Sequence, residues 1–179
     1  FVERITETAD ELTALGDKAR EIEGIMAASD DADAVTDLSR LVQYVASEAR
    51  TEYPDADVAV DLGEGARVAA AEEVCWPVVW NLVENAVEHH DRSDPAVTIE
   101  AVPDDDHPDE WLRLRVADDG PGIPEEEVNR IFDPFFTTKD PGEGTGLGLA
   151  IAHRIMDRFD GDIAVDSEPG EGATFTLTF

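Results

Sequence analysis

The sequence holds very few of the residues that would point to a secreted or membrane-spanning protein. There is 1 cysteine among 179 residues, so no disulfide can form within the chain and a reducing compartment is expected. We expect that residue, Cys75, to be a small buried apolar side chain. No apolar run is long enough to cross a membrane, and no signal peptide stands at the start. A cytoplasmic location is therefore expected.

Cationic side chains are also scarce. Thirteen lysines and arginines stand against 43 acidic residues, and the net charge is −30. Such a surface repels nucleic acid and anionic membranes, so we expect no nucleic-acid partner. The acids are spread along the chain and 42% of residues are hydrophobic, which argues against a disordered acidic segment. We interpret the charge as that of a folded protein from a high-salt cytoplasm, where ions screen the self-repulsion.

Residues 1–30 form an amphipathic segment. Apolar side chains alternate at steps of four and three, as in a coiled coil, with Thr8 as the one exception: Phe1, Ile5, Leu12, Leu15, Ala19, Ile22 and Met26. Because a lone helix would leave this stripe exposed, we expect a partner. Either this helix packs on the chain's own domain, or it resembles the second helix of a dimerisation hairpin and packs against the first. The chain starts at Phe1 within this pattern, which suggests a piece of a longer protein.

The remaining residues, 35–179, read as one α/β domain. Helices are expected from Asp37 to Tyr53, over residues 71–90 with an awkward Pro77 inside, and from Leu147 to Phe159. A short helix is expected over residues 124–130. Strands are expected over residues 57–62, 96–102, 111–117, 161–166 and 173–179, with Arg67-Val68 pairing back onto the first of them. The pattern predicts a mixed sheet with about three helices on one face.

Two glycine clusters are the most informative feature that the chain does contain. The first is Gly120-Pro-Gly122 after Asp118-Asp119, and the second runs through residues 142–148 into an apolar helical pattern. A glycine loop that opens a helix aims unpaired N–H groups and a positive dipole end at whatever lies before it, and phosphate is the usual ligand. No Gly-Lys-Ser/Thr follows, so this is not a Walker loop.

Four blocks stand in a fixed order. In chain order, the blocks are Asn81-Leu-Val-Glu-Asn85, Asp118-Asp-Gly120-Pro-Gly122-Ile123, Arg130-Ile-Phe132-Asp-Pro-Phe135-Phe136-Thr-Thr-Lys139 and Gly144-Thr145-Gly146-Leu147-Gly148-Leu149. In this order they resemble the N, G1, F and G2 boxes of the sensor histidine kinases, within the wider gyrase, chaperone, histidine kinase and mismatch-repair ATPase superfamily. The resemblance covers roughly residues 35–179. It implies a two-layer sandwich of the Bergerat type, which holds a nucleotide between helices and a lid over residues 133–145.

The resemblance also assigns roles. Asn81 and Asn85 share one helix face, and an amide oxygen suits Mg²⁺. By resemblance Asn85 is the Mg²⁺ ligand and Asn81 supports it, while Asp118 accepts a hydrogen bond from the adenine amine. The implied ATP-binding set is Asn81, Asn85, His89, Asp118, Gly120, Gly122, Ile123, Lys139, Gly144, Thr145, Gly146, Leu147, Gly148, Leu149 and Thr174. ATP and Mg²⁺ are the implied cofactors.

Several assignments have plainer alternatives. His89 could be a half-buried residue at a helix end, and Lys139 a solvated loop cation rather than a phosphate ligand. Phe132, Phe135 and Phe136 could be core residues rather than anchors of a mobile lid. The chain also departs from the family at two places. Glu88 stands where many members carry a phosphate-binding lysine, and Ala173 stands where the adenine-side threonine is expected.

The function expected from the resemblance is phosphoryl transfer. Asn81 cannot accept a proton, which disfavours the water activation of the gyrase-like ATPases. The four histidines are His89, His90, His107 and His153, so residues 1–28 hold no acceptor. We expect transfer to a histidine on a dimerisation helix outside this chain, in the same or a sister subunit, and relay to a response regulator receiver domain. The full-length protein is expected to be a homodimer, anchored in a membrane elsewhere or soluble. A nucleotide-binding regulatory module is the alternative.

Overall fold

A computed structural model describes residue 16 and residues 36–62, 67–68, 72–90, 92–103, 112–139 and 144–179. The predicted amphipathic segment of residues 1–30 lies outside these ranges, apart from that one position. The predicted boundary between it and a domain starting at residue 35 therefore stays a prediction. No helix among the described residues is long and apolar enough to cross a membrane.

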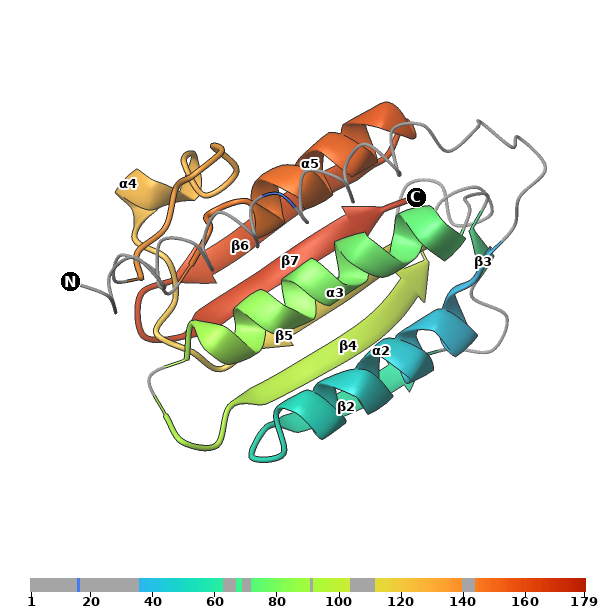
Figure 1. The fold of residues 1–179 in the computed structure, drawn as a ribbon, viewed down its shortest axis with the longest axis horizontal. Coiled ribbons are helices and arrows are strands. Elements are labelled where there is room, and N and C mark those ends of the chain that lie inside the picture. The colour runs from blue at the N-terminus through green and yellow to red at the C-terminus, as the bar shows by residue number, and fades with distance from the viewer. Residues whose placement is uncertain are drawn as a thin grey trace.

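A five-stranded mixed sheet forms one layer of the domain (Figure 1). The strand order is β2-β4-β5-β7-β6. β2 and β4 are parallel, and the other neighbouring pairs are antiparallel. The bounds are Asp57–Leu62 for β2, Ala96–Pro103 for β4, Leu112–Asp118 for β5, Asp162–Glu168 for β6 and Gly172–Thr178 for β7.

Three helices cover one face of this sheet, as the sequence predicts. They are α2 (Leu38–Glu52), α3 (Glu72–Glu88) and α5 (Gly148–Arg158), and Figure 1 shows them side by side in front of the strands. Strand residues alternate between the helix-covered face and the opposite face, and those on the helix-covered face are buried: Val97, Ile99, Leu114, Val116, Phe175 and Leu177. Cys75 on α3 is fully buried among apolar residues, which confirms the prediction. The predicted α/β two-layer fold is confirmed.

The prediction for Arg67-Val68 is wrong. These residues form β3, which pairs antiparallel with β1 (Thr36–Asp37) and not with β2. β2 instead forms an edge of the main sheet beside β4. The Arg50 guanidinium of α2 donates hydrogen bonds to the carbonyl of Val58, which ties this edge strand to the helix layer.

Pro77 lies inside α3, which begins before it at Glu72, so this proline does not start the helix. Proline removes one backbone donor from the helix but leaves its own carbonyl able to accept. That carbonyl accepts a hydrogen bond from the side-chain amide of Asn81, at 2.7 Å. The proline therefore stands one turn before the first residue of the predicted site. α4 is a short helix, Glu125–Val128.

Candidate functional site

Asn81 and Asn85 lie on the face of α3 that meets the start of α5. Asn81 is 4% exposed, and its Oδ1 is a buried acceptor without a hydrogen-bond partner among the described residues. A Cβ on Gly148 would lie 2.7 Å from this oxygen and 3.5 Å from Nδ2 of Asn85. Glycine at position 148 thus lets the two elements approach closely. The side-chain amide of Asn85 donates a hydrogen bond to the backbone carbonyl of Asn81 at 2.7 Å, which holds this side chain against its own helix.

The second glycine cluster runs directly into α5. Leu147 is buried at the helix start, and α5 begins at Gly148, so the first N–H groups of the helix open beside Asn81 and Asn85. Gly146 has φ of +61°, and a Cβ there would lie 2.6 Å from backbone atoms of Phe135 and Phe136. The amide of Phe135 donates to the carbonyl of Gly146 at 2.8 Å. Only glycine fits this contact between the F box and the glycine loop.

Asp118 lies at the end of β5, on the helix-covered face of the sheet. Its Oδ1 accepts hydrogen bonds from the amides of Gly120 (2.9 Å) and Ala173 (3.3 Å). No described residue donates to Oδ2, so that oxygen can accept from a ligand. Burial raises the pKa of Asp118, while the two amides and the nearby His90 act in the opposite direction.

Close backbone contacts hold the first glycine loop. A Cβ on Gly122 would lie 2.1 Å from the carbonyl oxygen of Glu168, and one on Gly172 would lie 2.0 Å from that of Asp118. Ser167 links the two loops, because its hydroxyl accepts from the amide of Ile123 at 2.8 Å and donates to the carbonyl of Gly172 at 2.7 Å. No sequence pattern predicts this role of Ser167, because its two partners come from different segments of the chain.

Asp119 is partly exposed, and its side chain has several hydrogen-bond partners. Its Oδ1 accepts from the amide of Ala96 at 2.9 Å, and its two oxygens contact His90 and Arg92, each at 2.7 Å. These partners, with the Ala96 amide first, hold the pKa of Asp119 below its usual value. The His90 ring also lies near Gly120. This cluster fastens the C-terminal end of α3 to the first glycine loop and was not predicted.

Lys139 is mostly buried, so it is not the solvated loop cation of the plainer alternative. Its ammonium pairs with Oε2 of Glu88, and its side chain is 16% exposed. Tyr53 donates a hydrogen bond to the other oxygen of Glu88 at 3.1 Å, and burial followed by the Glu88 charge raises the pKa of Tyr53. The stem of Lys139 lies against Gly144, whose Cβ would meet Cδ at 3.1 Å. The lysine therefore connects the second glycine loop to α3.

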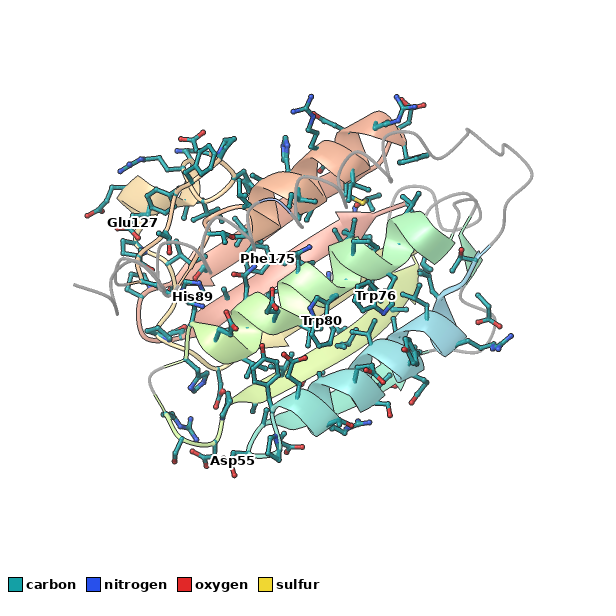
Figure 2. The ribbon with its side chains drawn as sticks, in the orientation of Figure 1. Asp55, Trp76, Trp80, His89, Glu127 and Phe175 are labelled. Atoms are coloured by element: carbon teal, nitrogen blue, oxygen red, sulfur yellow. The ribbon has the colours of Figure 1, made fainter. Side chains whose placement is uncertain are left out.

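His89 lies at the C-terminal end of α3, on the side nearer to α4 (Figure 2). The residue keeps part of its surface in solvent. Partial desolvation of the ring by neighbouring protein atoms lowers the pKa of His89, and the positive charge of Lys139 lowers it further. Both effects favour the neutral imidazole. On the opposite side of α3, facing α2, Trp76 and Trp80 stack with ring centroids 5.6 Å apart.

Some of the predicted site residues do not lie beside Asn81, Asn85 and Asp118. Thr174 pairs with Ala117, and its side chain lies on the face of the sheet opposite to Asp118 and Ala173. Its predicted contact with a nucleotide gains no support from this geometry. Phe132 and Phe136 pack against the core, whereas Phe135 is 66% exposed and has φ of +68°. The core interpretation is therefore confirmed for Phe132 and Phe136, and a role of these phenylalanines as anchors of a mobile lid stays a prediction.

The candidate site comprises Asn81, Asn85, Asp118 and the glycine loop at residues 144–148. Its groups could bind a polyanion and the exocyclic amine of a purine at the same time. α3 contributes the side-chain amides of Asn81 and Asn85, and α5 contributes an N-terminus that no described side chain caps. β5 contributes the Asp118 carboxylate, whose Oδ2 accepts from no described residue. Thr145 and Leu149 lie in the same loop and first helical turn, partly buried. Among the described residues, no group of three or more His, Cys, Asp or Glu side chains could hold a metal ion. A Mg²⁺ ion at Asn85 would therefore take its other ligands from phosphate and water, which is the arrangement that Mg²⁺ favours.

Comparison with known proteins agrees with these features. Residues 72–179 match the family described as histidine kinase-, DNA gyrase B-, and HSP90-like ATPase. Among curated proteins, the chain is 43% identical over 104 residues to the sensor histidine kinase RcsC of Escherichia coli, covering 56% of this chain and 10% of that protein. It is 40% identical over 99 residues to sporulation kinase A of Bacillus subtilis, covering 55% of this chain and 15% of the kinase. The chain spans only a small part of these relatives.

Solved structures give the same family. Full-length ShkA in complex with AMPPNP matches with a TM-score of 0.79 and 27% identity, over 99% of this chain and 37% of ShkA. The catalytic domain of the histidine kinase ThkA matches with a TM-score of 0.70 and 29% identity, over 82% of this chain and 93% of that domain. The resemblance inferred from the four boxes is thereby confirmed.

Proposed function

The chain belongs to the histidine kinase-, DNA gyrase B- and HSP90-like ATPases, and we propose that it is the Mg-ATP-binding catalytic domain of a sensor histidine kinase. In this proposal Asp118 accepts from the adenine amine through its free Oδ2. Asn85 ligates Mg²⁺, supported by Asn81. The glycine loop at residues 144–148 and the start of α5 bind the phosphates through backbone N–H groups.

The observation that carries the proposal is the meeting of α3 and α5 at Gly148. It puts a buried, unpaired oxygen of Asn81 and the amide of Asn85 beside an open helix N-terminus. A buried acceptor without a partner costs folding free energy, so a ligand that supplies a donor there, such as metal-bound water, gives a reason for its presence. The bound Mg²⁺ supplies charge neutralisation at the phosphates.

The reaction proposed is transfer of the γ-phosphoryl group to a histidine outside this chain, on a dimerisation helix of the same or a sister subunit. A receiver domain of a response regulator would then accept the phosphoryl group. The chain's own residues position the nucleotide and exclude water. Asn81 supports transfer over hydrolysis, because an amide cannot take a proton from water.

Calorimetric titration of the protein with Mg-ATP tests the binding step. Asn85→Asp adds a negative charge beside the phosphates and Asp118→Ala removes the adenine acceptor, so each should lower affinity at least about tenfold. Asn129→Asp and Asp162→Ala are matched controls at exposed positions and should bind as the parent does. Unchanged affinity in well-folded Asn85→Asp and Asp118→Ala proteins would refute the proposed site.

A transfer assay tests the reaction. The protein is mixed with a separately supplied acceptor-helix piece and ATP labelled at the γ-phosphate, and acid-labile phosphate on the helix is the expected product. The departures at Glu88 and Ala173 support a second candidate, a regulatory module that binds nucleotide without transferring phosphate. Tight Mg-ATP binding with no labelled helix would favour that candidate. Steady hydrolysis of ATP by the domain alone would instead favour a gyrase-like ATPase.

A further inference from the structure

We propose that Glu88 sets the nucleotide affinity of this site, because its carboxylate competes with the nucleotide's phosphates for the ammonium of Lys139. This inference rests on the proposed function, and it assigns a role to an acidic residue that would otherwise only repel ATP. The competing group is built into α3, in the same helix that carries Asn81 and Asn85.

The contacts hold Lys139 on Glu88. The ammonium pairs with one carboxylate oxygen, and the Tyr53 hydroxyl donates to the other, so Glu88 is oriented from two sides. The lysine stem is held as well, because Gly144 leaves it room to lie against the loop backbone. With 16% of its side chain exposed, Lys139 is far less accessible than an ordinary loop lysine.

The position of this pair relates it to the proposed phosphate site. Asn81, Asn85 and Glu88 follow one another at helical steps of four and three, so they lie along one face of α3. Asn81 meets the glycine loop at Gly148, and the Glu88–Lys139 pair meets the same loop at Gly144. The loop therefore crosses this face of α3 between its contacts at Gly144 and Gly148, and Asn85 lies between these two contacts. Glu88 follows Asn85 by three residues, about one helical turn, so a phosphate bound at Asn85 would lie near the Glu88–Lys139 pair.

The Glu88 carboxylate and the nucleotide phosphates are both negatively charged, so they compete for the ammonium of Lys139. The ammonium is the one cation paired with Glu88 in the described part of the chain, and a polyphosphate brings a larger negative charge to the same place. When phosphate takes Lys139, Glu88 loses its partner and also repels the ligand. Both effects oppose binding, so removing the Glu88 charge should strengthen it.

The first measurement is Mg-ATP affinity of the whole 179-residue protein by calorimetry at fixed KCl. Glu88→Gln keeps the size of the side chain and should tighten binding about fivefold. Glu52→Gln is the matched control, because it removes the same charge from an exposed residue beside Tyr53. The control should leave the affinity within about a factor of 1.5, since exposed charges at a distance are screened.

The second measurement follows Lys139 directly. The chain has only two lysines, Lys18 and Lys139, so an amine-reactive ester followed by peptide mass spectrometry reports each of them separately. Without nucleotide, Glu88→Gln should raise the labelling of Lys139 relative to Lys18 at least about threefold, because the ammonium loses its carboxylate partner. Mg-ATP should then protect Lys139 in both the parent and the variant.

These outcomes separate this inference from the proposed function. If the parent protein binds no Mg-ATP, or binds it equally after Asn85→Asp, the proposed function fails. If the parent binds and Asn85→Asp does not, but Glu88→Gln gives no tighter binding than Glu52→Gln, the competition is refuted. Weaker binding by Glu88→Gln would also refute it, since Glu88 would then be positioning Lys139 for the ligand. Unchanged labelling of Lys139 would show that the pair does not form in solution.

Discussion

Replacing Gly146 with alanine tests the contact that joins the F box to the glycine loop. Gly146 has φ of +61°, and an added Cβ would lie 2.6 Å from the carbonyl carbon of Phe135 and from the carbonyl oxygen of Phe136. Backbone atoms cannot turn aside as a side-chain tip can. The substitution must therefore distort the turn at Phe135 or open the hydrogen bond between the Phe135 amide and the Gly146 carbonyl.

The loss of folding free energy in Gly146→Ala has two parts, a net backbone term and a steric clash. A left-handed backbone costs alanine about 1–2 kcal/mol relative to glycine. Reduced freedom of the unfolded chain returns about 0.4–1 kcal/mol of this. The clash with backbone adds about 1–3 kcal/mol, the usual range for overpacking. Gly170 isolates the first part, because it has φ of +88° and no atom within 4 Å of an added Cβ. We expect Gly170→Ala to lose about 1 kcal/mol and Gly146→Ala about 2–4 kcal/mol.

Urea unfolding followed by circular dichroism, in molar KCl, gives both free energies of unfolding. Mg-ATP titration of the same samples shows whether the loop still binds. Gly146→Ala should bind at least about tenfold more weakly, because Gly148 and the start of α5 are displaced, whereas Gly170→Ala should bind normally. Equal losses of stability in the two variants would refute the reasoning, because the close approach of Phe135 and Phe136 would then have no energetic consequence.

Two further predictions concern pH and salt. Because burial raises the pKa of Asp118 above that of a free aspartate, stability falls as the pH rises from the free aspartate pKa through the folded-state pKa, and the full loss is present at pH 7. Asp118→Asn should therefore raise the melting temperature of the ligand-free protein at pH 7, and an unchanged or lower value would contradict this. Adenine binding needs the charged form, so Mg-ATP affinity should fall as the pH drops through that raised pKa, and Asp118→Asn should lack this part of the calorimetric pH profile. With a net charge of −30, the melting temperature should rise steadily between low and molar KCl. A melting temperature that is independent of KCl would exclude adaptation to high salt.

Much of the fold was predictable because each helix and strand carries its own periodicity. The strand at residues 57–62 was predicted with its observed bounds, and the three large helices differ from the prediction by one or two residues at each end. Pairing between segments was less predictable. Arg67-Val68 joins β1 instead of β2, and β2 runs parallel to β4, although nothing in either strand indicates its neighbour. Alternation along a strand is local, whereas the choice of partner depends on how the helices pack.

The sequence alone determined which residue types the site contains and which of them share an element. Asn81 and Asn85 had to lie on one face of a helix because they are four residues apart, and a glycine loop entering α5 had to leave its first N–H groups open. Only the tertiary structure decided what those residues meet. It brought Lys139 onto Glu88, 51 positions away, joined Ile123 to Gly172 through Ser167, and turned Thr174 to the face opposite Asp118. The physical reason is that backbone periodicity is set by neighbours in the chain. Contacts between distant side chains depend on the close packing of the whole domain.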